Sequence, residues 1–194
     1  AEGIEANVAT GYHAIEFLLW GQDLNGNNPG NGIRPASDYD KENCTHSNCF
    51  RRAQYLKAAV DLLVQDLEEM VSYWTDSGKA TLMLKNNYSL AMSSILMGMG
   101  SLSYGELAGE RMQLGLYLND PEEEHDCFSD NTHNSHYYNQ VGISNIYYAN
   151  YKRMNGNEIS GYSLSDFIQK TNPKFSKVMN SKIQNATRAL SNVR

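Results

Sequence analysis

A histidine and a glutamate stand three residues apart in an apolar segment, GYHAIEFLLWGQD, at residues 11–23. On a helix, His13 and Glu16 would lie on the same side, about one turn apart. The residues around them are apolar, so this helix is expected to be mostly buried. A carboxylate there is costly unless a cation, a metal ion or several hydrogen bonds meet it. The pair is therefore either a polar pair satisfied within the core or half of a metal site.

A second histidine and carboxylate show the same spacing in the opposite order, at Asp130 and His133. If the two segments met, two histidines and two carboxylates would converge, a set that suits iron, manganese or zinc. A capped turn, in which Asp130 holds local backbone amides, explains this second pair equally well. We interpret His125, which stands among acidic residues, as part of a solvated face, and we interpret His46 and His136 in the same way.

Two further groups could line a pocket. Glu106 and Glu110 are four residues apart and are followed by Arg111. They could be ligands, or Arg111 could pair with one of them in a buried salt bridge. Arg34, in a glycine-rich loop, could reach a ligand carboxylate or phosphate.

Several classes of function are excluded or unsupported. Acidic residues outnumber basic ones by 22 to 16, and no long basic run occurs, which argues against a nucleic-acid partner. No apolar run is long enough to span a membrane, and the first ten residues do not resemble a signal peptide, so any export signal is expected to have been removed. The histidine–glutamate pair fits neither standard zinc-peptidase helix, and no nucleophile elbow or phosphate-binding glycine loop is present. Catalytic residues are therefore not assigned.

Cys44 and Cys49 flank a short polar loop that a disulfide would close. They could instead hold a metal ion with His46, but too few further ligands stand nearby for a closed zinc site. A disulfide would favour an oxidising compartment. Cys127 is then left over, and we interpret it as a small buried apolar residue.

Helical periodicity dominates the chain. Residues 49–75 place apolar side chains three and four residues apart, with Asn48 as the expected N-cap. Further helices are predicted over about 80–117, over 140–154, from a capping box at Ser163 and Asp166 to about Lys170, and from Pro173 onward. No segment alternates like a strand, so the class is all-α, an antiparallel helical bundle. The loop at residues 21–48 is long enough to be functional or flexible.

The chain resembles the imelysin-like family. GYHAIEF matches the family's G-x-H-x-x-E signature, and GIRPASDY, SYGELAGERM and CFSDNTH resemble its following segments in the same order. The family includes an insulin-cleaving membrane protease and the iron-regulated protein A group, and is similar to iron-uptake lipoproteins. Four segments in series across residues 11–133 make the resemblance specific.

The resemblance implies a bacterial periplasmic, cell-surface or outer-membrane protein, built from two four-helix bundles and often lipid-anchored. It implies a metal or ligand site at His13 and Glu16. It also makes several other residues candidates to line the pocket: Arg34, Glu106, Arg111, Asp130 and His133. Iron is the expected metal, with zinc as the alternative, and an iron-linked small ligand is an alternative to the metal itself.

The motif begins earlier here than in family members, which carry a helical region before it. Residues 1–194 are therefore expected to be one imelysin-like domain, processed or truncated at the N-terminus and also ending early, with the missing segment as a possible partner. The membrane would be reached only through a lipid anchor outside the chain. Three functions follow: an iron-binding protein for uptake, which we favour; a metallopeptidase; and a surface interaction module with a structural His–Glu pair.

Overall fold

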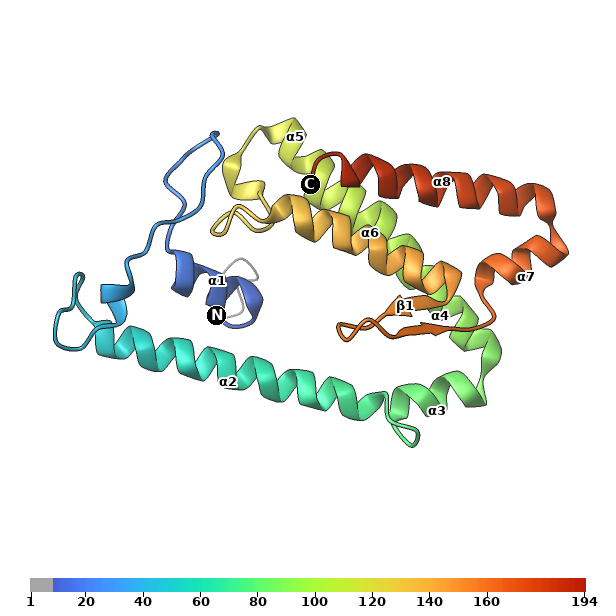
Figure 1. Ribbon diagram of the computed structural model, residues 1–194, viewed down its shortest axis with the longest axis horizontal. Coiled ribbons are helices and arrows are strands. Elements are labelled where there is room, and N and C mark those ends of the chain that lie inside the picture. Colours follow the sequence, from blue (N-terminus) through green and yellow to red (C-terminus); the bar gives the residue numbers. More distant parts are fainter. Residues whose placement is uncertain (1–8) are drawn as a thin grey trace. The chain divides into compact units, whose positions relative to one another are not determined.

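Helices make up most of the computed structural model, which describes residues 9–194 (Figure 1). The all-α class predicted from the sequence is confirmed. The chain forms two units: the first contains residues up to Leu96 together with Asn119–Asn131, and the second contains Met97–Leu118 and Thr132–Arg194. Each unit is described by itself. No helix within residues 9–194 is long and apolar enough to cross a bilayer.

The first unit is organised around one long helix. Its elements are α1 (Tyr12–Trp20), η1 (Ala36–Tyr39), α2 (Cys49–Tyr73), α3 (Lys79–Asn86), the start of α4 (Tyr88–Gly100) and the short turn η3 (Pro121–Glu123). Both α1 and η1 pack against α2. Glycines with positive φ bound α1, Gly11 at 85° and Gly21 at 84°, a conformation that side chains with a Cβ rarely adopt. These two glycines therefore fix α1 as a nine-residue helix.

The helix predicted at residues 49–75 is confirmed as α2, but its predicted cap is wrong. Asn48 has a left-handed backbone, with φ at 69°, and its side chain makes no capping hydrogen bond. An N-cap side chain reaches the first free amides from an extended backbone, so the left-handed conformation removes the cap.

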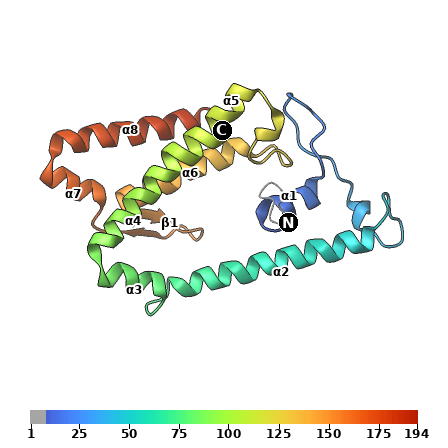
Figure 2. The same cartoon turned by 180° about the vertical axis from the view of Figure 1, so that it is seen from behind.

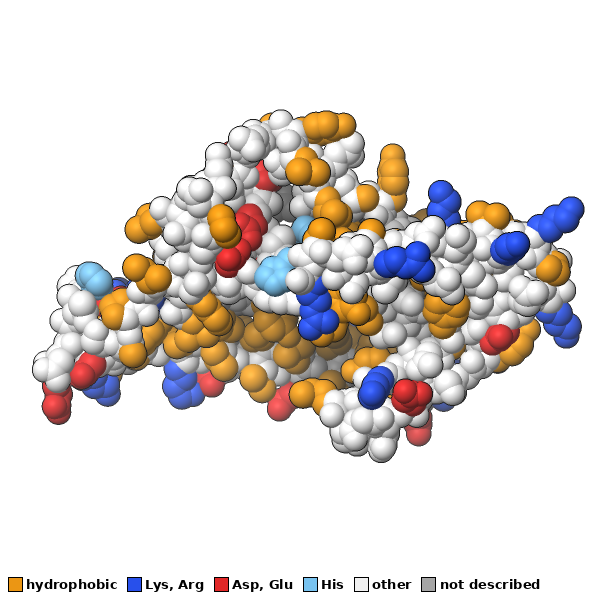
Figure 3. Space-filling view, turned by 45° about the horizontal axis from the view of Figure 1, so that its top comes forward, with side chains coloured by type: hydrophobic (Ala, Val, Ile, Leu, Met, Phe, Trp, Pro, Cys, Tyr) orange, Lys and Arg blue, Asp and Glu red, His pale blue; other side chains and the backbone are white. Residues whose placement is uncertain are grey.

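Apolar side chains are widely exposed over the described residues. Among residues of α2 only Cys49 and Ala59 are buried, whereas Val64, Met70 and Val71 are exposed. The expectation that α1 is mostly buried is likewise wrong, because only Ala14 and Leu18 are buried in it. Figure 3 shows hydrophobic side chains spread over the face that it draws. Few residues of either helix are therefore covered by the neighbouring elements.

The second unit contains the remaining helices and a short hairpin. Its elements after α4 are η2 (Ser101–Gln113), α5 (Leu114–Leu118), α6 (Thr132–Tyr148), β1 (Asn150–Lys152), β2 (Glu158–Ser160), α7 (Leu164–Thr171) and α8 (Pro173–Ser191). α6 packs against α8, α7 and η2, and Figure 2 shows this group from behind. The buried Gln140 of α6 donates to the carbonyl oxygen of Ile183 on α8 at 3.3 Å.

The continuous helix predicted over about 80–117 is wrong at two places. The chain leaves helical geometry at Asn87, whose side-chain oxygen accepts a hydrogen bond from the amide of Leu90, so the helix is interrupted between α3 and α4. From Ser101 the helix widens into η2, a π-helix of 13 residues. An apolar pattern of threes and fours does not separate this wider helix from an α-helix.

The antiparallel hairpin of β1 and β2 was not predicted. Tyr151 pairs with Ile159 in it, and the helix expected at residues 140–154 begins earlier, at Thr132, and ends at Tyr148. Ala149 follows with a φ of 46°, which ends the helix. Strands of three exposed residues carry no apolar alternation, so the sequence offered no signal for them.

The capping box predicted at the start of α7 is confirmed. The Ser163 hydroxyl accepts from the amide of Asp166, and the Asp166 carboxylate accepts from the amide of Ser163, both at 3.0 Å. Hydrogen bonds from the hydroxyl and amide of Ser163 hold the pKa of Asp166 below its ordinary value. The start of α8 at Pro173 is also confirmed.

The long loop before α2 is ordered around the buried carboxylate of Asp38. His46 Nδ1 lies 2.6 Å from one carboxylate oxygen, and Arg34 donates to the other at 3.0 Å. Arg52 of α2 donates to the backbone carbonyl of Asp38 at 2.7 Å. Burial opposes ionisation of this carboxyl, but the hydrogen bonds from His46 and Arg34 outweigh it and hold the pKa of Asp38 below its ordinary value. The cluster therefore gives the loop one fixed conformation.

The same loop holds the C-terminal end of α1. Arg34 also donates to the carbonyl oxygen of Phe17, and the Tyr39 hydroxyl donates to that of Leu18. Helix ends leave carbonyls without helical partners, and the Tyr39 hydroxyl satisfies that of Leu18, whereas the Phe17 carbonyl also accepts from the amide of Gly21 at 2.8 Å. His46, interpreted from the sequence as solvated, is exposed over 65% of its side chain but still bonds to Asp38.

Cys44 and Cys49 are joined by a disulfide in this loop. Its sequence separation of 5 closes a short ring that contains His46. Replacing both cysteines with serine is expected to lower the free energy of unfolding by roughly 2 kcal/mol, since so short a ring removes little chain entropy. Urea unfolding under non-reducing conditions measures this loss. A Cys127→Ser variant is the control, and equal losses in the two proteins would contradict a stabilising role for the disulfide.

Candidate functional site

His13 and Glu16 of α1 contact one another directly. His13 Nδ1 lies 3.0 Å from Glu16 Oε2, as their spacing on one turn of helix allows. The other oxygen of Glu16 accepts from the amide and the hydroxyl of Ser129, at 2.9 and 2.5 Å. The Glu16 side chain is only 10% exposed. Glu16 is thus a bridge between His13 and the segment at residues 119–131, and both of its oxygens are engaged.

Phe128, the residue before Ser129, holds the segment at residues 119–131 against α1 through its ring and its backbone carbonyl. The Phe128 ring packs edge-on against Phe17 with centroids 5.1 Å apart, and its carbonyl accepts from the amide of Gly32 at 2.9 Å. Gly32 is required here, because a Cβ on it would lie 2.5 Å from the carbonyl oxygen of Trp20. These contacts determine where the residues just before Phe128 lie.

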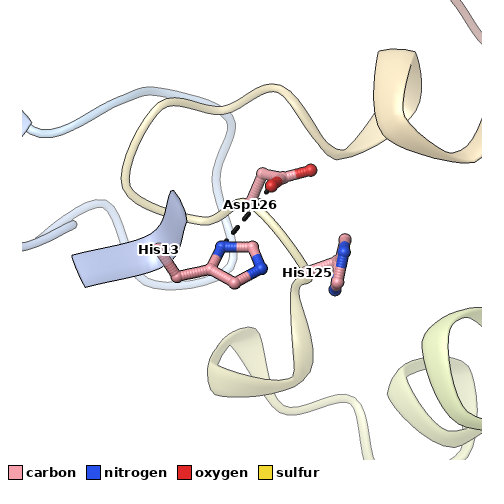
Figure 4. Close-up of side chains that lie close together, drawn as sticks. All are labelled: His13, His125 and Asp126. Atoms are coloured by element: carbon pink, nitrogen blue, oxygen red, sulfur yellow. Dashed lines mark ion pairs between the residues drawn. The ribbon is translucent and has the colours of Figure 1, made fainter. Parts of the chain in front are cut away.

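His125 and Asp126, at the start of this fixed stretch, lie beside His13 (Figure 4). Asp126 Oδ1 is 3.6 Å from His13 Nδ1. The rings of His13 and His125 have centroids 4.8 Å apart and are nearly perpendicular. One ligand atom from each of His13, His125 and Asp126 lies within 4.8 Å of the others, and all three residues are half-buried. Two imidazoles and a carboxylate are thereby brought together in the first unit.

This arrangement corrects the interpretation of His125 as part of a solvated face. Asp130 and His133, which the sequence offered as a second half of the site with a capped turn as the equal alternative, are not part of this cluster of three. Asp130 lies in a turn with φ at 54°, and His133 lies in α6 of the second unit, with Nε2 3.1 Å from the side chain of Asn134. The usable signal was the adjacent pair of His125 and Asp126, which the three preceding glutamates obscured.

The remaining candidates from the sequence lie elsewhere. Glu106 and Arg111 form an ion pair of 3.4 Å on η2, and the Glu106 side chain is 52% exposed, so the pair is not buried. Their spacing of five residues is that of a π-helix turn. Glu110 is exposed on the same helix. Arg34 is engaged by Asp38 and Phe17, as described above, and does not line the cavity beside His13.

A cavity of about 830 Å³ opens beside the cluster, within the first unit. Its walls include His13 and His125 from the cluster, the aromatic residues Phe17, Tyr55 and Phe128, and the first turn of α2 with Arg51 and Arg52. Cys127, the cysteine outside the disulfide, also lines it and is half-buried rather than buried as expected. A ligand in this cavity would contact the histidine cluster directly.

Comparison with known proteins agrees with the resemblance seen in the sequence. The family model described as Imelysin, which defines a peptidase family, matches residues 1–194. A search of curated proteins finds no match to the chain. Because the match spans the whole chain, this protein belongs to the imelysin family.

Proposed function

We propose that this imelysin-family protein binds a transition-metal ion through His13, His125 and Asp126, with Glu16 as the residue that positions His13. The observation that carries the proposal is the convergence of three ligand atoms, from two segments more than 100 residues apart, within 4.8 Å of one another. This assignment keeps His13 from the G-x-H-x-x-E signature as a ligand. It replaces Glu16 by Asp126 as the carboxylate ligand.

The donor set suits iron(II) or zinc. Two imidazoles and one carboxylate are ligands that both ions accept, and three protein ligands leave positions for water or another ligand. Two donors on one ion at roughly 2.1 Å each are at most roughly 4.2 Å apart. In a tetrahedral site two such donors are roughly 3.4 Å apart, so a pair at the 4.8 Å limit closes by roughly 1.4 Å on binding. Small side-chain rotations achieve this, since His13 is 38% exposed.

Glu16 supports binding from behind the ligand. A carboxylate that accepts a hydrogen bond from one imidazole N–H fixes the tautomer and leaves the other nitrogen with a lone pair for a metal. Glu16 stands in this position at 3.0 Å from His13 Nδ1, and Ser129 holds its second oxygen. The carboxylate oxygens of Glu16 are thus engaged in orienting His13.

These commitments favour binding over hydrolysis. A metallopeptidase needs a carboxylate able to accept a proton from metal-bound water. Glu16 is engaged by His13 and Ser129 and does not meet that need. We therefore propose a role in metal uptake or homeostasis, with iron as the first candidate. The disulfide supports a location in an oxidising compartment, the periplasm or cell surface of a bacterium, reached with a lipid anchor where one is attached.

Isothermal titration of chelator-treated protein tests the proposal. We expect one Zn²⁺ per chain, and one Fe²⁺ per chain under anaerobic conditions. A His133→Asn variant, which changes an exposed histidine of the second unit, is the matched control and should bind as the wild type does. The absence of saturable binding of either ion, or its loss in the His133→Asn control, would contradict the assignment.

A further inference from the structure

The cavity beside the cluster has the size and the walls of a site for an organic molecule. Its volume of about 830 Å³ is within the range of small-molecule sites in proteins. Ala14, Phe17 and Leu18 of α1 form one apolar wall, and Phe128 packs edge-on against Phe17 beside them. Phe17 and Tyr55 remain 41% and 46% exposed, so their ring surfaces are open to a partner. An aromatic or branched apolar body would cover these rings.

The polar wall of the cavity carries positive charge. Arg51 and Arg52 both line it, from the first turn of α2. Arg52 is committed to the loop, since it donates to the carbonyls of Asp38 and Ser47 at 2.7 and 3.1 Å. Arg51 is exposed and makes no hydrogen bond or ion pair within the described residues. Its guanidinium is thus available to a ligand carboxylate or sulfonate.

Two other features add to this positive potential. The first turn of α2 contains no acidic residue, so the partial positive charge at the start of this 25-residue helix is not neutralised there. A metal ion at His13 and His125, which also line the cavity, would add further positive charge. Glu124 is the single carboxylate among the described lining residues, and the two arginines outweigh its charge.

We propose that this cavity binds a small organic anion whose apolar body lies against Phe17, Tyr55 and Phe128 and whose acidic group pairs with Arg51. This inference deepens the proposed function. Contact between the anion and a metal ion rests on that function, whereas the cavity and Arg51 are present without a metal ion. A bound anion of this kind would sit against the histidine cluster and could complete the coordination of the ion.

The test uses two fluorescent probes that differ in one charge. Anilinonaphthalene sulfonate carries an acidic group on an aromatic body, and phenylnaphthylamine is the same body without it. Both are titrated into chelator-treated wild type, Arg51→Gln and Lys57→Gln. Lys57 is on α2 and pairs with Asp61 outside the cavity, so its variant is the control for charge. We expect Arg51→Gln to lower the affinity for the sulfonate about tenfold, which corresponds to the loss of one charged hydrogen bond. The affinity for the neutral probe should not change.

Alkylation of Cys127 locates the bound probe, since this cysteine lines the same cavity. We expect saturating sulfonate to slow the reaction of Cys127 with N-ethylmaleimide in the wild type. Unchanged sulfonate affinity in Arg51→Gln, an equal loss in Lys57→Gln, or no protection of Cys127 would each overturn the inference. The probe titrations contain no metal ion, so their outcome is independent of the Zn²⁺ titration. Failure of one test therefore does not count against the proposal that the other test addresses.

Discussion

Alanine in place of either His13 or His125 is expected to lower the affinity for Zn²⁺ at least ~100-fold. Removing a residue that only orients a ligand already costs about 10- to 100-fold, and these changes each remove one of three ligands. Titration calorimetry on chelator-treated variants measures the effect. Both side chains are half-buried at the edge of a cavity, so the variants should retain the wild-type circular dichroism spectrum and thermal midpoint within a few degrees.

A Glu16 variant distinguishes two hypotheses: that His13, His125 and Asp126 bind the ion, and that His13 and Glu16 of the signature bind it. We expect Glu16→Gln to lower the affinity for Zn²⁺ by only about tenfold, because this change removes a positioning residue and leaves all three ligands in place. Ser129→Ala, which removes one donor to Glu16, should have a smaller effect in the same direction. A loss in Glu16→Gln equal to that in His13→Ala, with Asp126→Asn unaffected, would show instead that Glu16 is the carboxylate ligand.

The second large effect is on stability and arises at Asp38. Replacing Asp38 with alanine leaves the Arg34 guanidinium and the His46 imidazole without the carboxylate that both contact. Breaking such a buried pair is strongly destabilising, so we expect the thermal midpoint near pH 7 to fall by roughly 10 °C. The loop that holds the C-terminal end of α1 would loosen with it.

The same change should remove part of the acid sensitivity of the protein. The pKa of Asp38 is lowered in the folded chain, so its contribution to stability is complete above its ordinary pKa, near pH 4, and is lost as the pH falls through the lowered value. The difference in stability between the wild type and Asp38→Ala should therefore be constant near neutral pH and should become smaller below about pH 4. Thermal unfolding between pH 2.5 and 7 measures it.

Asp40→Asn is the matched control for Asp38. Among residues 9–194 its carboxylate accepts from nearby Glu42 and Asn43 in a local turn, which an asparagine side chain can also cap. We expect a small change in the thermal midpoint. A fall as large as that of Asp38→Ala, or a difference for Asp38 that is as large at pH 2.5 as at pH 7, would contradict the role given to the buried cluster.

Local sequence signals predicted the fold best. The capping box of Ser163 and Asp166 depends on residues three apart, and the contact of His13 with Glu16 depends on the same spacing, so both could be seen without a structure. The break at Asn87 and the π-helix η2 could not, because helical periodicity hardly changes across them. Three-residue strands likewise leave no pattern.

The site itself was only half visible from the sequence. His13 could be singled out because a polar residue in an apolar helix is unusual, but its partners depend on a chain return of more than 100 residues. That return is fixed by Phe128, Gly32 and Ser129 through packing, a close backbone approach and a hydrogen bond. None of these contacts has a short sequence signature. Spacing along the sequence therefore pointed to His133, whereas the structure brings His125 beside His13.

The most direct test of the central claim is an anomalous-difference map from crystals grown with Zn²⁺, recorded on both sides of the zinc absorption edge. We expect one strong peak within bonding distance of a nitrogen of His13, a nitrogen of His125 and a carboxylate oxygen of Asp126, with Glu16 still hydrogen-bonded to His13. A map with no peak at these three residues, or with zinc held by Glu16 in place of Asp126, would contradict the account.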